Sequence, residues 1–168
     1  MRQATSLTFL VFVLAACQSA TDPRPIASRA VAALDVPVQL TFHEPVIPEL
    51  KRGVCPVAPE GFCGSGVVIP FGNATEMIDF GAGCGGSCDL RTIQLPQGSI
   101  TLEETFSNPA CPGDCHPNRA EPVSGTLTDV VVGGTGLFDG ATGVLNGTVK
   151  AAGPESVAKL SGTILLAS

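Results

Sequence analysis

The sequence predicts an all-β protein: a single antiparallel barrel of about eight strands, with loops pinned by disulfides. The regular segments alternate apolar and polar residues and are rich in β-branched side chains, and none beyond the N-terminal segment keeps a helical apolar period over three turns. Turn signals recur at short intervals in a chain of 168 residues with 20 Gly and 14 Pro. Glycine also recurs inside three successive predicted strands, at Gly125, Gly147 and Gly162. Strand glycines suit a tightly coiled sheet, so we favour a closed barrel over a flat sandwich, with coincidence in a glycine-rich chain as the alternative.

The first predicted strand starts near Val36, because apolar residues from Val36 to Phe42 alternate with polar residues or proline. The proline-containing segments 44–60 and 108–122 are predicted to be loops. We expect Gly72 and Asn73 to form a hairpin turn. The remaining predicted strands cover Val67–Phe71, Ala74–Phe80, Leu90–Leu95, Ser99–Phe106, Val123–Val132, Val144–Ala151 and Val157–Leu166.

The N-terminus has the pattern of an export signal. A positive residue, Arg2, precedes the apolar stretch from Leu7 to Ala16, which is shorter than the ~20 residues needed to cross a bilayer. The four residues from Leu14 to Cys17, Leu-Ala-Ala-Cys, resemble the bacterial lipobox. That resemblance implies cleavage before Cys17 and attachment of a diacylglyceryl thioether and an amide-linked acyl chain such as palmitate. The alternative is an ordinary secretory signal that happens to contain a cysteine.

These features divide the chain into three parts. We expect residues 1–16 to be a lipoprotein signal peptide, 17–34 a flexible tether, and 35–168 the barrel domain. The membrane is then a partner through the lipid anchor. Gln18 after the cysteine implies, within the lipoprotein family, an outer-membrane lipoprotein facing the periplasm or the surface, and an anchor in the cell membrane is the alternative.

Seven cysteines are present, and six remain when Cys17 is set aside. In an exported chain an even number predicts disulfides. The spacing is local, so we expect neighbours to pair, although the sequence alone leaves other connectivities open. The three expected pairs are Cys55 with Cys63, Cys84 with Cys88, and Cys111 with Cys115.

Two cofactor hypotheses compete with this interpretation. The segment from Cys111 to His116 is close to a haem-attachment motif, but three residues rather than two separate its thiols. A zinc site from Cys84, Cys88, Cys111 and Cys115 has suitable ligand types, but an oxidising compartment favours disulfides. The spacing of Cys84 and Cys88 also differs from that of a thioredoxin-type pair. We therefore expect no cofactor and no metal.

A glycine-rich segment joins two of the late strands. Its residues Gly133, Gly134, Thr135, Gly136, Phe138, Gly140, Ala141 and Gly143 match G-G-T-G-x-F-x-G-A-x-G. This segment resembles one found between two strands in the allene oxide cyclase-like and dirigent-like barrel families. The resemblance implies an eight-stranded antiparallel barrel with a hydrophobic cavity and an apolar small molecule as ligand. Glycines permit left-handed turns, and Phe138 is expected to close one end of the barrel.

The formal charge of −6 leaves no basic surface for nucleic acid, so nucleic-acid binding is excluded. Glu104 shares a strand face with Ile100 and Phe106 and is the candidate for a buried catalytic acid, with a mouth position in water as the alternative. Three functions stay open: binding of an apolar small molecule in the barrel, a structural or interaction role in the envelope with a filled barrel, and a cyclase- or isomerase-like activity. The sequence favours a role other than catalysis and names no protein partner.

Overall fold

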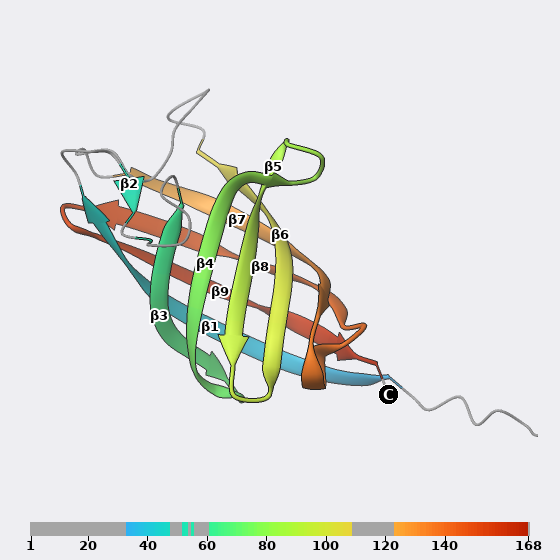
Figure 1. Ribbon diagram of the computed structural model, residues 1–168. Coiled ribbons are helices and arrows are strands. Elements are labelled where there is room, and N and C mark those ends of the chain that lie inside the picture. The colour runs from blue at the N-terminus through green and yellow to red at the C-terminus, as the bar shows by residue number, and fades with distance from the viewer. Residues whose placement is uncertain (1–32, 48–51, 54, 56–60, 109–122, 168) are drawn as a thin grey trace, which may run out of the picture. The chain divides into compact units, whose positions relative to one another are not determined.

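The computed structural model describes residues 33–47, 52–53, 55, 61–108 and 123–167, and these residues form an antiparallel β-barrel (Figure 1). Each strand pairs with the next one along the sheet, and β1 also pairs with β9, which closes the barrel. Eight strands form the wall, and the short β2 adds to one edge of β1. The strands are β1 (Leu34–Ile47), β2 (Arg52–Gly53), β3 (Phe62–Ile69), β4 (Gly72–Gly83), β5 (Cys88–Leu95), β6 (Gly98–Ser107), β7 (Val123–Gly134), β8 (Thr142–Ala152) and β9 (Glu155–Leu166).

The predicted closed barrel is confirmed, and the strand glycines lie where neighbouring groups approach the backbone closely. On β8, a Cβ atom at Gly147 would lie 1.9 Å from the carbonyl oxygen of Lys159 on β9. A Cβ atom at Gly125 would lie 2.2 Å from the ring of Phe106, and one at Gly162 would lie 2.2 Å from the carbonyl oxygen of Val144. These positions face inward, so a side chain there would push neighbouring strands apart.

Several predicted boundaries were wrong. β1 runs from Leu34 to Ile47, so the predicted loop from Glu44 begins later. The hairpin between β3 and β4 turns at residues 70–71, and Gly72 already belongs to β4. The apolar run of β3 also extends back to Phe62, through glycines that mask the alternating pattern in the sequence.

The barrel has two different ends. At one end, called the entry end, the chain enters β1 at Leu34, β9 finishes, and the turns after β3 and β5 lie (Figure 1). The other end, called the loop end, carries the turn from residue 84 to 87 and the pairs Cys55–Cys63 and Cys84–Cys88. Both described disulfides join neighbours, as predicted. The predicted pair Cys111–Cys115 lies outside the described residues, as does Cys17.

The glycine-rich segment closes the entry end. Residues 136–138 form the short 3-10 helix η2 (Gly136–Phe138), and Phe138 is fully buried, with its ring edge-to-face against Phe71 at 4.9 Å between centroids. Gly136 has a φ of 61°, and a Cβ there would lie 2.3 Å from the carbonyl oxygen of Gln97. From this plug an apolar core extends along the barrel interior, with residues such as Leu40, Ile100 and Ile164 fully buried or nearly so.

Candidate functional site

Five charged side chains project into the barrel interior from five different strands. Each occupies an inward position of the two-residue strand period, so the alternation that buries Leu102 also buries Glu104. All five are at most 4 % exposed, whereas Lys, Glu, Arg and Asp are almost never fully buried without partners. This group, called the interior cluster, consists of Glu44 on β1, Glu76 on β4, Arg91 on β5, Glu104 on β6 and Asp129 on β7.

Arg91 stands at the centre of the interior cluster. Its Nε donates a hydrogen bond of 2.7 Å to Oε2 of Glu104, and its two terminal nitrogens contact Glu104 and Glu76. Glu44 and Asp129 lie slightly farther away, each with one carboxylate oxygen 3.5 Å from a guanidinium nitrogen. One guanidinium thus faces four acids, and the planar, permanently charged arginine can contact several carboxyl groups at once.

The interior cluster contains four carboxyl groups and a single positive charge, and the pKa values of three of the acids are raised. Burial raises the pKa of Glu76 well above its usual value and outweighs the opposing charge of Arg91. Burial likewise raises the pKa of Glu104 against the effect of Arg91. Burial, followed by the charge of Glu104, raises the pKa of Asp129 to about 8. Asp129 therefore holds its proton near neutral pH.

The pKa of Arg91 shifts in the direction that keeps it charged. Burial lowers this pKa, but the charges of Glu104, Glu76, Glu44 and Asp129 together raise it further, so the net pKa lies above the ordinary value. Several oxygens nevertheless lack a hydrogen-bond donor. They are Oε1 of Glu44, Oε1 of Glu76 and both carboxyl oxygens of Asp129, and the hydroxyl of Ser156 is also unpaired. Buried acceptors without donors are rare in native proteins and are typical of a site that a further molecule or water completes.

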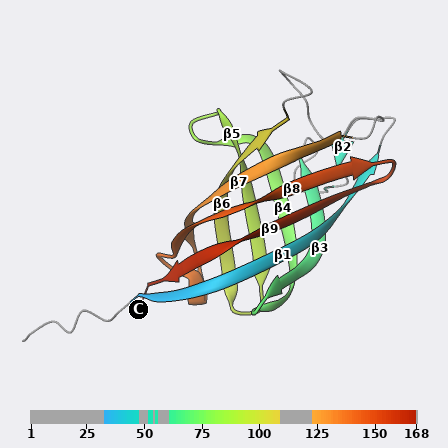
Figure 2. The same cartoon turned by 180° about the vertical axis from the view of Figure 1, so that it is seen from behind.

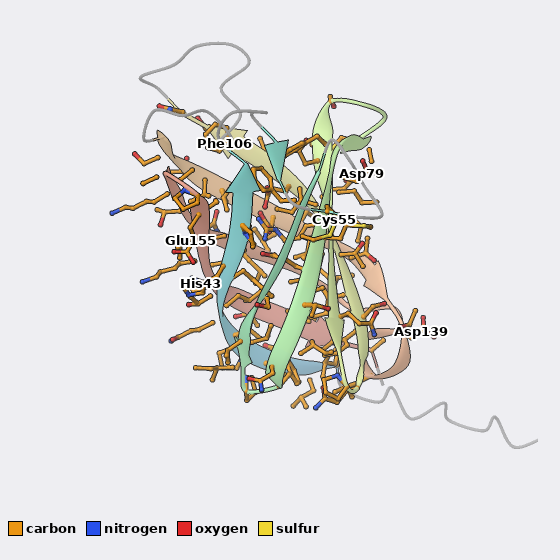
Figure 3. The ribbon with its side chains drawn as sticks, turned by 60° about the vertical axis from the view of Figure 1, so that its left-hand side comes forward. His43, Cys55, Asp79, Phe106, Asp139 and Glu155 are labelled. Carbon is orange, nitrogen blue, oxygen red and sulfur yellow. A yellow bond between two sulfur atoms is a disulfide. The ribbon has the colours of Figure 1, made fainter. Side chains whose placement is uncertain are left out.

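A small cavity lies beside the interior cluster, toward the loop end. Its volume is about 20 Å³, counted as space for the centre of a water molecule, which is enough for about one water. One part of its wall is polar, with Glu44, Asp89, Arg91 and Glu104. The rest is apolar and consists of Phe62, Ile78, Phe80, Phe106, Leu127 and Val149. Figure 3 shows Phe106 at the same end of the barrel as Cys55 and Asp79.

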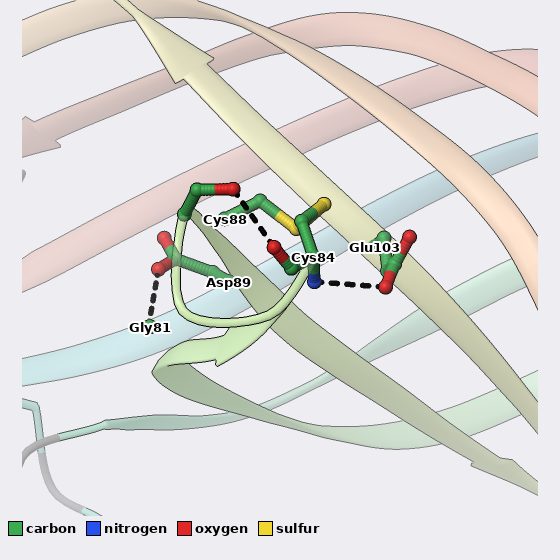
Figure 4. Close-up of a disulfide and its surroundings, with 6 residues drawn as sticks. Gly81, Cys84, Cys88, Asp89 and Glu103 are labelled. Atoms are coloured by element: carbon green, nitrogen blue, oxygen red, sulfur yellow. Dashed lines mark hydrogen bonds between the residues drawn. A yellow bond between two sulfur atoms is a disulfide. The ribbon is translucent and has the colours of Figure 1, made fainter.

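The turn around the Cys84–Cys88 disulfide carries another group of potential ligand side chains among the described residues (Figure 4). The carboxylate of Glu103 accepts a 2.8 Å hydrogen bond from the backbone N–H of Cys84, and Asp89 accepts one of 2.9 Å from Gly81. The two sulfurs and a Glu103 oxygen lie within 4.8 Å of one another. Because the sulfurs are bonded to each other, they are not thiolates, and the turn is held as a structural unit.

The structure places the predicted candidate Glu104 in the interior, not at a mouth in water. It brings Glu104 together with Arg91, Glu76, Glu44 and Asp129, which sequence reasoning did not select. A signal for some of them was present: Glu76 lies two residues from both Ala74 and Ile78, and Asp129 two residues from both Leu127 and Val131, so each belongs to an apolar strand face. The turn residues of the glycine-rich segment lie at the entry end, away from the interior cluster.

Comparison of the chain with protein-family models, curated proteins and solved structures finds no match. Within the described ranges, the structure contains no helix of sufficient length and hydropathy to span a membrane.

Proposed function

We propose that this chain is a lipid-anchored protein of the cell envelope whose barrel binds a small, mostly apolar molecule with a hydrogen-bonding group. The single observation that carries the binding proposal is the two-sided cavity, apolar across its phenylalanines and polar along Arg91 and Glu104. Ligand sites commonly combine a largely apolar wall with a few polar groups that fix orientation. The anchor rests on the lipobox at Leu14–Cys17.

The unpaired oxygens indicate what the polar group of the ligand does. Glu44 lines the cavity, and its Oε1 lies 3.5 Å from a terminal nitrogen of Arg91 without accepting a hydrogen bond. A ligand hydroxyl, amine or amide that donates a hydrogen bond would satisfy such an acceptor. The ligand would have to displace aromatic side chains, because drug-sized ligands occupy roughly 300–1,000 Å³. Phe80 and Phe106 are the rings best placed to move, since both are only half-buried.

Native mass spectrometry of the full-length protein purified from its membrane tests this proposal. It reports acylation at Cys17 and any co-purified small molecule in one measurement. Leu127→Phe adds bulk to the cavity wall, whereas Thr126→Phe on the same strand points outward and is the matched control. We expect a bound molecule in the wild type and in Thr126→Phe and its loss in Leu127→Phe. No bound molecule in any of the three, together with melting temperatures unmoved by a panel of apolar compounds, would contradict the proposal.

One observation favours a second candidate, a structural or interaction role with a filled barrel. The apolar core occupies most of the described interior, and the cavity has room for about one water. In that case the connections 48–60 and 109–122 would carry contacts to an envelope partner. Loss of partner capture after exchange of these two connections, without change in barrel stability, would distinguish this function from ligand binding.

An isomerase-like reaction on the bound molecule is a third candidate. Glu104 and Asp129 lie beside Arg91, and burial raises the pKa of both, which favours a carboxyl group that can deliver a proton and recover it. The Glu104→Gln variant should then retain the bound molecule but no longer convert it. Unchanged conversion by Glu104→Gln would remove Glu104 from the catalytic role.

A further inference from the structure

The outer surface of the barrel differs between its two halves: exposed apolar side chains lie near the entry end, and most charged side chains lie near the loop end. Its exposed large apolar side chains lie in the half nearest the entry end, among residues 34–39, 67–75, 93–101, 130–145 and 161–167. Within these described residues the charged side chains are Asp35 and Asp139. The half nearest the loop end carries outward-facing His43, Asp79, Glu103, Lys150, Glu155 and Lys159. Figure 3 shows Asp139 at the opposite end from Asp79, with His43 and Glu155 adjacent on one side.

Six of the exposed apolar residues form a surface, here called the apolar collar, along the wall and rim of the entry end. They are Leu34, Val130, Val132, Leu137, Val144 and Leu165. Val130 and Val144 are directly paired across β7 and β8, and Leu165 on β9 pairs with Thr142 and Asp35. The wall formed by β7, β8, β9 and β1 is continuous in Figure 2. Val67 and Ile69 add exposed apolar side chains on β3, the strand that pairs with β1.

The chain enters this surface a short distance after the predicted lipidation site. β1 begins at Leu34, within the apolar collar, and Cys17 precedes it by 17 residues. A segment of that length reaches at most about 60 Å, so an anchored barrel stays within reach of the bilayer at a high local concentration. The segment is too long to impose one orientation by itself. A surface whose contact with lipid lowers the free energy would therefore determine the orientation of the barrel.

We propose that the barrel rests on the lipid bilayer through the apolar collar, with its loop end directed away from the membrane. This inference rests on the lipid anchor of the proposed function. The entry half lacks lysine and arginine among its described residues, so apolar contact rather than attraction to anionic headgroups would hold it. Binding is then insensitive to salt. The interior cluster and its cavity, near the loop end, face the aqueous side.

A single introduced tryptophan tests this orientation, because the chain contains no Trp. Val132→Trp places the fluorophore in the apolar collar, and Ser124→Trp places it outward on the same strand, toward the loop end. The full-length protein is bound to phosphatidylcholine vesicles whose acyl chains are brominated. We expect Val132→Trp to lose most of its fluorescence and Ser124→Trp to lose little, at both low and high salt. Leu165→Trp serves as a second collar position if Val132→Trp does not fold.

Equal quenching at both positions, or none in the collar, would overturn the proposal. A concentration-dependent fluorescence shift that is the same with and without bromine would instead assign the collar to a second copy of the chain, which also overturns it. The mass of the Cys17 peptide is measured in the same sample. An unmodified Cys17 with quenching confined to the collar would remove the lipid anchor but retain the membrane-facing surface, so the two failures are distinguishable.

Discussion

Replacement of Asp129 by asparagine isolates the electrostatic effect of the interior cluster on stability. In the folded protein the pKa of Asp129 is about 8, against an ordinary value of 3.8. The folded state therefore keeps a proton on Asp129 over a pH range in which the unfolded chain has lost it. The stability that this group contributes is present in full below about pH 4 and is lost as the pH rises toward about 8.

The size of the effect follows from that pKa. Between the two pKa values each pH unit costs the wild type about 1.4 kcal/mol from this group alone. From pH 5 to pH 7 the wild type should lose about 2 to 3 kcal/mol that Asp129→Asn does not lose, because asparagine does not titrate. Asparagine also keeps the shape of a protonated aspartic acid. A difference in the free energy of unfolding that is the same at every pH does not affect the comparison, because only the pH dependence of the two proteins is compared.

Denaturant unfolding of both proteins at pH 5, 6 and 7 measures this difference. Asp79→Asn, which changes an exposed carboxylate on β4, is the control and should follow the wild type. Parallel curves for wild type and Asp129→Asn over this range would show that Asp129 does not hold its proton in the fold. That result would refute the electrostatic argument for the interior cluster.

Three further substitutions test other parts of the structure by denaturant unfolding. Arg91→Met should cost about 3–5 kcal/mol at pH 7, because it leaves buried carboxyl groups without their cation; a cost below about 1 kcal/mol would contradict this. Gly147→Ala should cost about 1–3 kcal/mol, since its Cβ would lie 1.9 Å from the carbonyl oxygen of Lys159, while outward-facing Thr148→Ala should have a small effect. Phe138→Ala should cost about 3–5 kcal/mol by emptying the plug at the entry end; a loss below about 1 kcal/mol would show that the plug is not part of the core.

Local signals carried the prediction of the fold. Alternation from Val36 to Phe42 and the glycines at 125, 147 and 162 were sufficient to predict strands and a closed sheet, because both depend on neighbouring residues. The hairpin after β3 was misplaced because Pro70 and Phe71 give a weaker turn signal than Gly72-Asn73. The start of β3 was missed because Gly64 and Gly66 stand at inward positions where an alternating strand would show apolar residues.

The interior cluster could be predicted only in part. Glu104 was selected from its own strand face, but its partners come from four other strands. Their meeting depends on sheet order and closure, which bring β1 and β4 toward the same interior space. Arg91 shares a strand face with the apolar residues Ile93 and Leu95, but only the assembled barrel shows that four acids surround it.

The division of the interior cluster among five strands has a consequence for folding accuracy. If any one of the four strands that carry the acids slipped by a single residue against its neighbour, its carboxyl group would turn to the outside and an outward residue would take its place. Arg91 would then lose a counterion while remaining dehydrated, a penalty that an all-aliphatic interior would not impose for the same mistake. We therefore expect these five side chains to discriminate the correct strand alignment from its near neighbours, at the expense of maximal stability.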